Sequence, residues 1–259
     1  MNKLSIITPI LKIDQNFKKL LTSVLKLKGR NFNFIIVAKY DLIKDLEKLV
    51  KKKNFIHIIS EVYSKGVYPA FNLALKSKYC NDFYMVLGQD DFLINKFLIQ
   101  EVEKEINISN DKIADIFTLD VISNIVYKKK SLSYETESLI KALFRNMNYF
   151  FSNHSGGMII KKKLHNKYGY YDEKFRIASD YDFLRKVKNK IFIKKTKILS
   201  ARLGVNGISQ QFLPSLFERY LIDLKYYRKF NIFLFLKFIY ALQKQTKIYY
   251  YKRFNRKSF

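Results

Sequence analysis

Only one cysteine, Cys80, occurs in the sequence, so an intramolecular disulfide and a multi-cysteine zinc cluster are excluded. Long apolar runs are also missing. The first residues lack the apolar core of a signal peptide, and the stretch 230–242, interrupted by Lys237, is shorter than the roughly 20 residues that span a bilayer. We therefore expect no export and no transmembrane helix, and a cytoplasmic protein that is free or held at the inner face of the membrane.

Acidic residues are scarce: 22 Asp and Glu stand against 49 Lys and Arg, which leaves a net charge of +27. This excess favours nucleic acid, an anionic membrane or a phosphate-bearing substrate as partner, and charge alone does not choose among them. A composition bias that places lysine on every solvated face is the other interpretation. With 16% aromatic and 48% hydrophobic residues the chain is not disordered, and 259 residues suit one main α/β domain with an appendage.

Short apolar runs that favour strands alternate with helical patterns over the first 90 residues. The runs lie at 4–8, 34–37, 55–59 and 83–87, and the apolar spacing of helices follows the first three of them. Strands that are apolar on both faces, each followed by a helix, indicate a parallel sheet covered on both sides. Because ligands bind beyond the carboxyl ends of such strands, one crevice is expected to be lined by Thr8 and by residues 38–41, 61–66 and 89–91.

Later segments are less regular. We expect one or two strands in 115–126, a helix in 135–145, a strand at 158–160 and a helix from Asp180. From about Pro214 the sequence changes to helical stretches rich in aromatic residues and cations. The domain prediction is a catalytic domain at 1–212 and a helical extension at 213–259.

The adjacent acids Asp90 and Asp91 directly follow the buried strand at 83–87. Two neighbouring carboxylates repel each other unless a cation or hydrogen-bond donors lie beside them. At the end of a strand in a nucleotide-binding sheet, they are placed to hold Mg²⁺ or Mn²⁺ against a diphosphate. A surface turn or a helix N-cap is the alternative interpretation.

Four motifs in order make the sequence resemble the family 2 glycosyltransferases. They are Ser5-Ile6-Ile7-Thr8-Pro9, then 66–72 (Gly-Val-Tyr-Pro-Ala-Phe-Asn), then Leu87-Gly88-Gln89-Asp90-Asp91, and finally 169–173 leading to Ala178-Ser179-Asp180-Tyr181-Asp182. The resemblance covers roughly residues 1–210. It implies a GT-A fold, which is a Rossmann-like, mostly parallel central sheet with helices on both faces. The family is similar to enzymes that build bacterial surface polysaccharides and lipopolysaccharide.

The resemblance further implies transfer of a sugar, usually a hexose, from a nucleoside diphosphate donor, favouring UDP, to a hydroxyl of a glycan or lipid-linked acceptor, with inversion. A divalent metal, Mg²⁺ or Mn²⁺, would stabilise the departing diphosphate. Asp180 would be the base that takes the proton of the acceptor hydroxyl. The remaining implied contacts are Asp91 to the metal, Asp90 to the ribose, Thr8 and Pro9 to the nucleoside, and Lys65, Gly66 and Asn72 around the donor.

Several positions depart from the family's pattern or leave alternatives open. Asp41 is only a candidate for recognition of the base, because the acidic turn usual after the second strand is Ala38-Lys39-Tyr40-Asp41. His154 is a candidate contact to acceptor or phosphates, although Ser155 replaces the usual glutamine. Asp180 could instead cap its helix. Asp182 is the competing base, but two positions along a helix it should point elsewhere.

Two further segments have open interpretations. The loop 204–209 is similar to a glycine-rich loop that closes over donor phosphates, or is a simple turn. The basic, aromatic extension at 213–259 could lie on an anionic membrane and bring the enzyme to a lipid-linked acceptor, pack on the catalytic domain, or bind nucleic acid. A nucleic-acid-binding protein without catalysis is the competing function. A nucleotidyltransferase is disfavoured because no glycine-rich phosphate loop follows the first strand.

Overall fold

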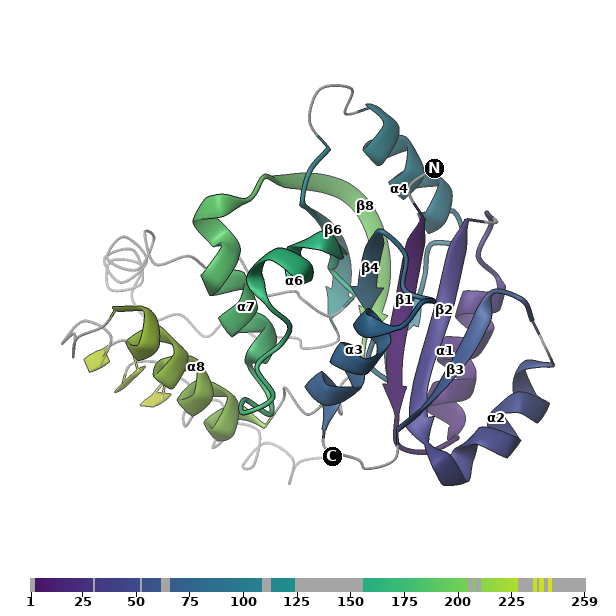
Figure 1. Ribbon diagram of the computed structural model, residues 1–259, viewed down its shortest axis with the longest axis horizontal. Coiled ribbons are helices and arrows are strands. Elements are labelled where there is room, and N and C mark those ends of the chain that lie inside the picture. Colours follow the sequence, from purple (N-terminus) through teal and green to yellow (C-terminus); the bar gives the residue numbers. More distant parts are fainter. Residues whose placement is uncertain are drawn as a thin grey trace, which may run out of the picture.

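The computed structural model describes residues 3–29, 31–51, 53–61, 66–108, 113–123, 156–204, 207 and 211–227, with three short pairs at 235–236, 238–239 and 242–243. Within these residues eight strands form one sheet in the order β3-β2-β1-β4-β7-β6-β8-β5 (Figure 1). The strands are β1 (Leu4–Ile10), β2 (Phe32–Lys39), β3 (Ile56–Glu61), β4 (Phe83–Val86), β5 (Phe92–Leu93), β6 (Ile116–Ser123), β7 (Met158–Lys161) and β8 (Ile193–Leu203). The predicted helix at 135–145 lies outside the described residues.

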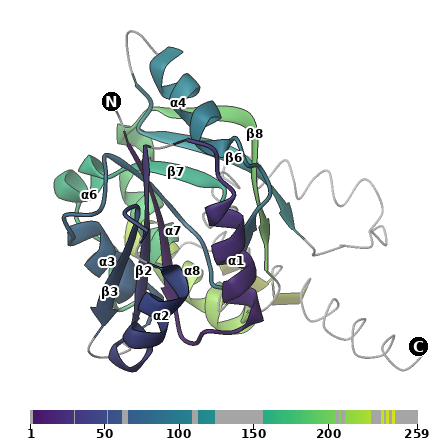
Figure 2. The ribbon, with the colours of Figure 1, turned by 90° about the vertical axis from the view of Figure 1, so that its right-hand side faces the viewer.

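Helices cover both faces of this sheet. They are α1 (Gln15–Leu25), α2 (Ile43–Val50), α3 (Val67–Lys76), α4 (Leu98–Ile108), α6 (Lys163–Tyr168), α7 (Ser179–Val187) and α8 (Phe212–Tyr227), with short 3₁₀ turns η1 (Tyr40–Leu42) and η2 (Lys188–Lys190). In Figure 2 the sheet is seen with α1 and α3 on opposite sides. No helix in the described part of the chain has both the length and the apolarity needed to cross a bilayer.

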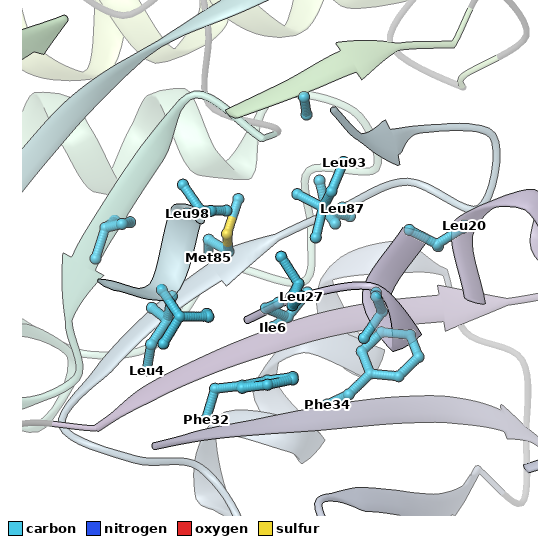
Figure 3. Packing of buried hydrophobic residues seen from close by; sticks show 14 of the residues in the cluster. Leu4, Ile6, Leu20, Leu27, Phe32, Phe34, Met85, Leu87, Leu93 and Leu98 are labelled. Carbon is cyan, nitrogen blue, oxygen red and sulfur yellow. The ribbon is translucent and has the colours of Figure 1, made fainter. Parts of the chain in front are cut away.

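The first half of the sheet is parallel, as its sequence predicted. β1 pairs in parallel with β2 and β4, and β2 pairs in parallel with β3. Side chains on the two faces of β1 enter different cores because successive residues of a strand point to opposite sides. Ile6 packs with α1, α2 and α4, whereas Ile7 packs with α3, α6 and α7. Figure 3 shows the first of these cores, where Leu20 and Leu98 meet the strands.

The second half of the sheet is mixed. β7 is antiparallel to both β4 and β6, β5 is antiparallel to β8, and β6 runs parallel to β8. The result is the expected central sheet with helices on both faces. One consequence matters for the site: the two residues of β5 directly follow Asp91 and pair with Ala201 and Arg202, so the end of β8 lies beside the acidic turn.

Candidate active site

The carboxyl ends of the four parallel strands lie along one edge of the sheet. β1 ends at Ile10, β2 at Lys39, β3 at Glu61 and β4 at Val86. The acidic turn, the start of α3 and the 3₁₀ turn η1 follow these ends and therefore share that edge. Asp41, in η1, is exposed.

Asp91 is buried, at 5% exposure, and its two carboxylate oxygens bind backbone N–H groups. Oδ2 accepts from Gly88 N at 2.7 Å, and Oδ1 accepts from Gly204 N at 2.8 Å. The first bond closes the turn, which a backbone bond from Asp91 N to Gly88 O also supports. The second joins the turn to the end of β8. Asp91 thus braces the site, which here means that its carboxylate binds the acidic turn and the end of β8 at the same time.

Asp90 is half-buried and lies directly against the backbone of Gly204. A Cβ atom added to Gly204 would be 2.1 Å from Oδ2 of Asp90, closer than any real Cβ contact. A Cβ at Gly88 would lie 3.2 Å from Oδ1 of the same residue. The two glycines therefore make the space in which the Asp90 carboxyl group sits.

One carboxylate at this position fits a divalent metal of the kind that nucleotide substrates carry. Mg²⁺ is usually held by one or two carboxylates together with substrate phosphates and water, and not by a cage made of protein alone. In the described part of the chain no three His, Cys, Asp or Glu side chains cluster as a ready metal site. The donor set is therefore suited to a metal that arrives with a diphosphate.

Gln89 links the acidic turn to the end of β1, a role that the sequence did not reveal. Its Oε1 accepts from Leu11 N at 2.9 Å. Nearby, Asp14 caps α1 by accepting from Phe17 N at 3.0 Å, and this hydrogen bond lowers the pKa of Asp14. The only signal for Gln89 in the sequence was that an amide replaces the first acid of an Asp-x-Asp pattern.

Three more of the predicted donor contacts, Thr8, Pro9 and Gly66, lie within the described residues. Thr8, in β1, is fully buried, and its hydroxyl has no hydrogen-bond partner within the described residues, while the neighbouring Pro9 is half-buried. Gly66 precedes α3 with a φ of 119°, a conformation that favours glycine. Lys65 and His154 lie outside the described residues.

Asn72 joins α3 to the segment ahead of α7. Its Nδ2 donates to Tyr171 O at 2.9 Å and to Glu173 Oε1 at 3.0 Å, and its Oδ1 accepts from Tyr171 N at 3.1 Å. The side chain is buried, and these three bonds occupy both amide hydrogens and the carbonyl oxygen. Asn72 therefore supports the site's framework from below the surface.

Asp180 lies in the first turn of α7, half-buried, beside the first turn of α3. Its Oδ1 accepts from the Tyr68 hydroxyl at 2.8 Å and from Tyr181 N at 2.8 Å. Burial, together with the Asp180 charge, raises the pKa of Tyr68 well above its usual 10.0, so this hydroxyl stays protonated and able to donate. Because α3 starts at the carboxyl edge, Tyr68 brings Asp180 to that edge.

The alternatives for Asp180 concern the start of its helix. Ala178 occupies the N-cap position of α7 and makes no side-chain capping hydrogen bond, while Asp180 Oδ1 accepts from Tyr181 N within the first turn. Asp182, the competing base, is 2% exposed and accepts from Lys225 Nζ of α8 at 2.9 Å. Asp182 thus contacts α8, whereas Asp180 contacts Tyr68 of α3.

The fold is that of known glycosyltransferase structures, although no family model and no curated protein matches the sequence. S. aureus TarS matches with a TM-score of 0.63 and 18% identity over 86% of this chain and 39% of its own. TarS 1–349 in complex with UDP-GlcNAc matches with a TM-score of 0.62 and 18% identity, over 85% of this chain and 64% of its own. Mannosyltransferase PcManGT from Pyrobaculum calidifontis, in complex with GDP-Man and Mn²⁺, matches with a TM-score of 0.62 and 10% identity. The match covers 89% of this chain and 65% of that protein. The chain spans less than two thirds of each of these proteins, and it has their GT-A-like fold.

Proposed function

We propose that this protein is a metal-dependent, inverting glycosyltransferase that moves a hexose from a nucleoside diphosphate donor to a hydroxyl of a glycan or lipid-linked acceptor. The observation that carries the proposal is the braced Asp90-Asp91 turn at the carboxyl edge of a GT-A-like sheet, with Asp180 brought to the same edge by Tyr68. The structural neighbours with UDP-GlcNAc and GDP-Man bound support a sugar nucleotide as donor. The resemblance to the family 2 glycosyltransferases favours UDP.

For the metal we propose Asp90 in place of Asp91. Both oxygens of Asp91 already accept backbone N–H groups, and breaking those bonds would leave buried donors unpaired, at a cost of about 1–3 kcal/mol. Asp90 is more exposed, and Gly204 leaves room for its carboxyl group. When bound, Mg²⁺ or Mn²⁺ supplies positive charge to the departing diphosphate. Thr8, Pro9, Asp41, Lys65 and Gly66 remain our proposed donor contacts.

For the base we propose Asp180. The acceptor hydroxyl gives its proton to the Asp180 carboxylate while the oxygen of that hydroxyl forms a bond to the anomeric carbon of the sugar. The bond between the anomeric carbon and the diphosphate breaks on the opposite face. The Tyr68 hydroxyl holds Oδ1 in place by its 2.8 Å hydrogen bond. His154 remains a proposed contact to the acceptor or the phosphates.

For the acceptor we propose a lipid-linked glycan at an anionic membrane surface, in the synthesis of a surface polysaccharide or lipopolysaccharide. The side chains of Leu213, Phe217 and Leu221 form an apolar stripe along α8 at 58%, 53% and 41% exposure. The following residues, 228–259, contain nine Lys and Arg and no Asp or Glu. An apolar stripe next to a cationic segment matches the chemistry of an anionic bilayer.

A thermal-shift panel tests the proposed donor and metal. UDP, UDP-GlcNAc, GDP and GDP-mannose are each compared with and without Mn²⁺, since a ligand that binds only the folded state raises its stability by about 2.7 kcal/mol at 100 times its Kd. We expect one base to stabilise the protein and Mn²⁺ to strengthen the effect. No stabilisation by any of the four would contradict the proposal.

The membrane contact is tested by co-sedimentation with vesicles of phosphatidylglycerol and phosphatidylcholine, against phosphatidylcholine alone. The double substitution Leu213→Ser and Phe217→Ser should reduce binding to the anionic vesicles. Leu25→Ser, which changes an exposed leucine of α1 at 45% exposure, is the matched control.

Binding to a single-stranded oligonucleotide tests the competing function. Tight, salt-dependent binding to the oligonucleotide without any response to sugar nucleotides would favour a nucleic-acid-binding protein.

A further inference from the structure

Glu218 of α8 binds the backbone of three consecutive residues just ahead of α7. Its Oε1 accepts from Arg176 N at 3.0 Å, and its Oε2 accepts from Ile177 N at 2.8 Å and from Ala178 N at 2.9 Å. The residues joined by these three bonds are 42, 41 and 40 positions apart in the chain. One side chain thus fixes the position of three peptide units.

These three peptide units lead into α7, whose second residue is Asp180. The N-cap residue of α7 is Ala178, which has no side-chain acceptor for the backbone. Glu218 of α8 accepts from the N–H of Ala178 and from those of the two residues before it. A carboxylate near a helix N-terminus is also favoured by the helix dipole.

The same segment is held from its other side by Tyr68. The Tyr68 hydroxyl shares its one proton between two acceptors, Ile177 O at 2.7 Å and Oδ1 of Asp180 at 2.8 Å. Ile177 is therefore bound at its N–H by Glu218 and at its carbonyl by Tyr68. A shift of this peptide unit would move the hydroxyl that orients the Asp180 carboxyl group.

α8 is also joined to α7 at points further along the helix, where Figure 1 shows the two side by side. Tyr181 donates its hydroxyl to Asp223 Oδ1 at 2.7 Å, and Lys225 pairs with Asp182 at 2.9 Å. These contacts would keep α7 and α8 together after a change at Glu218. The effect of such a change is therefore confined to residues 176–178 and their neighbours.

We propose that Glu218 is a positioning residue for Asp180: it holds residues 176–178 so that the carboxyl group of Asp180 meets the acceptor hydroxyl. This inference rests on the proposed function and goes beyond it, because it gives α8 a part in transfer in addition to membrane contact. Glu218 binds the backbone of residues 176–178, and the proposed donor and metal contacts do not include it. Its loss should therefore lower kcat and leave the KM for the donor unchanged.

The test compares wild type with Glu218→Ala, Glu218→Gln and Asp180→Asn. The glutamine keeps one acceptor oxygen, so it should be intermediate between wild type and alanine. Glu105→Gln is the matched control, because Glu105 is also half-buried, paired with Lys194 at 2.9 Å between α4 and β8, away from α7. UDP-GlcNAc and GDP-mannose are the probes, and release of UDP or GDP in the presence of Mn²⁺ gives kcat and KM. Amide hydrogen exchange of a peptide that covers residues 176–178 is measured on the same proteins.

We expect Glu218→Ala to lower kcat at least tenfold with KM within twofold of wild type, Glu218→Gln to lie between them, and Glu105→Gln to match wild type. Exchange at residues 176–178 should become faster in the alanine variant and remain unchanged in the control. Wild-type kcat in both Glu218 variants, or unchanged exchange, would overturn the inference. If the wild-type protein releases no more product than Asp180→Asn, the proposed function fails. If the wild-type protein is active and the Glu218 variants are equally active, only the inference about Glu218 fails. Should Glu218→Ala not fold, the glutamine variant and its exchange rate decide.

Discussion

The Tyr68 hydroxyl lies 2.8 Å from Oδ1 of Asp180, and it links the first turn of α3 to the first turn of α7. The Tyr68 ring packs independently of this bond, 5.5 Å from the ring of Tyr171 and 5.9 Å from that of Phe71. The contact at the hydroxyl and the packing of the ring can therefore be separated by mutation.

Tyr68→Phe should lower kcat by about tenfold, equivalent to about 1.4 kcal/mol, because Asp180 loses the hydrogen bond that orients it. Its free energy of unfolding should fall by about 1 kcal/mol. Tyr84→Phe is the control: it removes another buried hydroxyl, 2.7 Å from that of Tyr171, and should destabilise the protein without changing kcat. Steady-state kinetics and denaturant titration measure both. Equal kcat in the two variants would contradict the role of Tyr68.

Asp90→Asn and Asp91→Asn should behave differently despite being neighbours. Asp90→Asn should abolish the Mn²⁺-dependent thermal shift and leave the melting temperature of the unliganded protein nearly unchanged. Asp91→Asn should cost about 1–3 kcal/mol in stability, because an amide cannot accept from both Gly88 N and Gly204 N with two oxygens. If Asp91→Asn were as stable as wild type and insensitive to Mn²⁺, the metal would belong to Asp91, as the sequence alone suggested.

Gly204→Ala should weaken donor and metal binding, because the new Cβ would lie 2.1 Å from Oδ2 of Asp90 and would displace that carboxyl group. Calorimetric titration with Mn²⁺ and UDP or GDP measures the loss. Gly169→Ala is the contrasting variant: it has a φ of 91° and its Cβ would meet only Lys186 Nζ at 3.6 Å. We expect it to cost about 1–3 kcal/mol in backbone strain and to leave binding intact. Intact binding in Gly204→Ala would rule out Asp90 as the metal ligand.

The protein should lose stability in alkaline solution through its buried thiol. Burial raises the pKa of Cys80 from 9.0 to about 11, so the folded state holds the proton that the unfolded state releases. This contribution is fully present below pH 9 and is lost as the pH rises through about 11. Denaturant titrations of wild type and Cys80→Ala from pH 8 to 11 should show wild type losing about 2 kcal/mol relative to the variant. A constant difference would contradict the prediction. The native thiol should also react slowly with a disulfide reagent at pH 8 and rapidly in denaturant.

The local pattern of the sequence was sufficient to predict the fold, and the position of the site at the carboxyl edge stays a prediction. The apolar runs at 4–8, 34–37, 55–59 and 83–87 correspond to β1 to β4, because a strand buried on both faces must be apolar throughout. The acidic pair directly after β4 marked the edge where the ligand is expected. The start of α7 was predicted within one residue.

The roles within the site were harder to predict, because hydrogen-bond partners come from distant parts of the chain. Asp90 and Asp91 are neighbours in the sequence, yet the structure shows that Asp91 accepts a hydrogen bond from Gly204 N, 113 positions away, while the Asp90 carboxyl group lies against the same glycine. Asn72 was expected around the donor, which stays a prediction, and the structure adds that it binds Tyr171, 99 positions away. Glu218 gave no signal at all, since an isolated glutamate on an amphipathic helix is ordinarily solvated.

The sequence by itself determined the layered α/β architecture and the edge at which carboxylates gather, since periodicity and burial act over a few neighbouring residues. Only the tertiary structure decided that Asp91 binds the backbone of Gly88 and Gly204, that the Tyr68 hydroxyl contacts Asp180, and that Glu218 of α8 binds the segment before α7. The physical reason is that a buried carboxylate must satisfy its oxygens with whatever donors the folded chain brings near, and that set exists only after the strands and helices have packed.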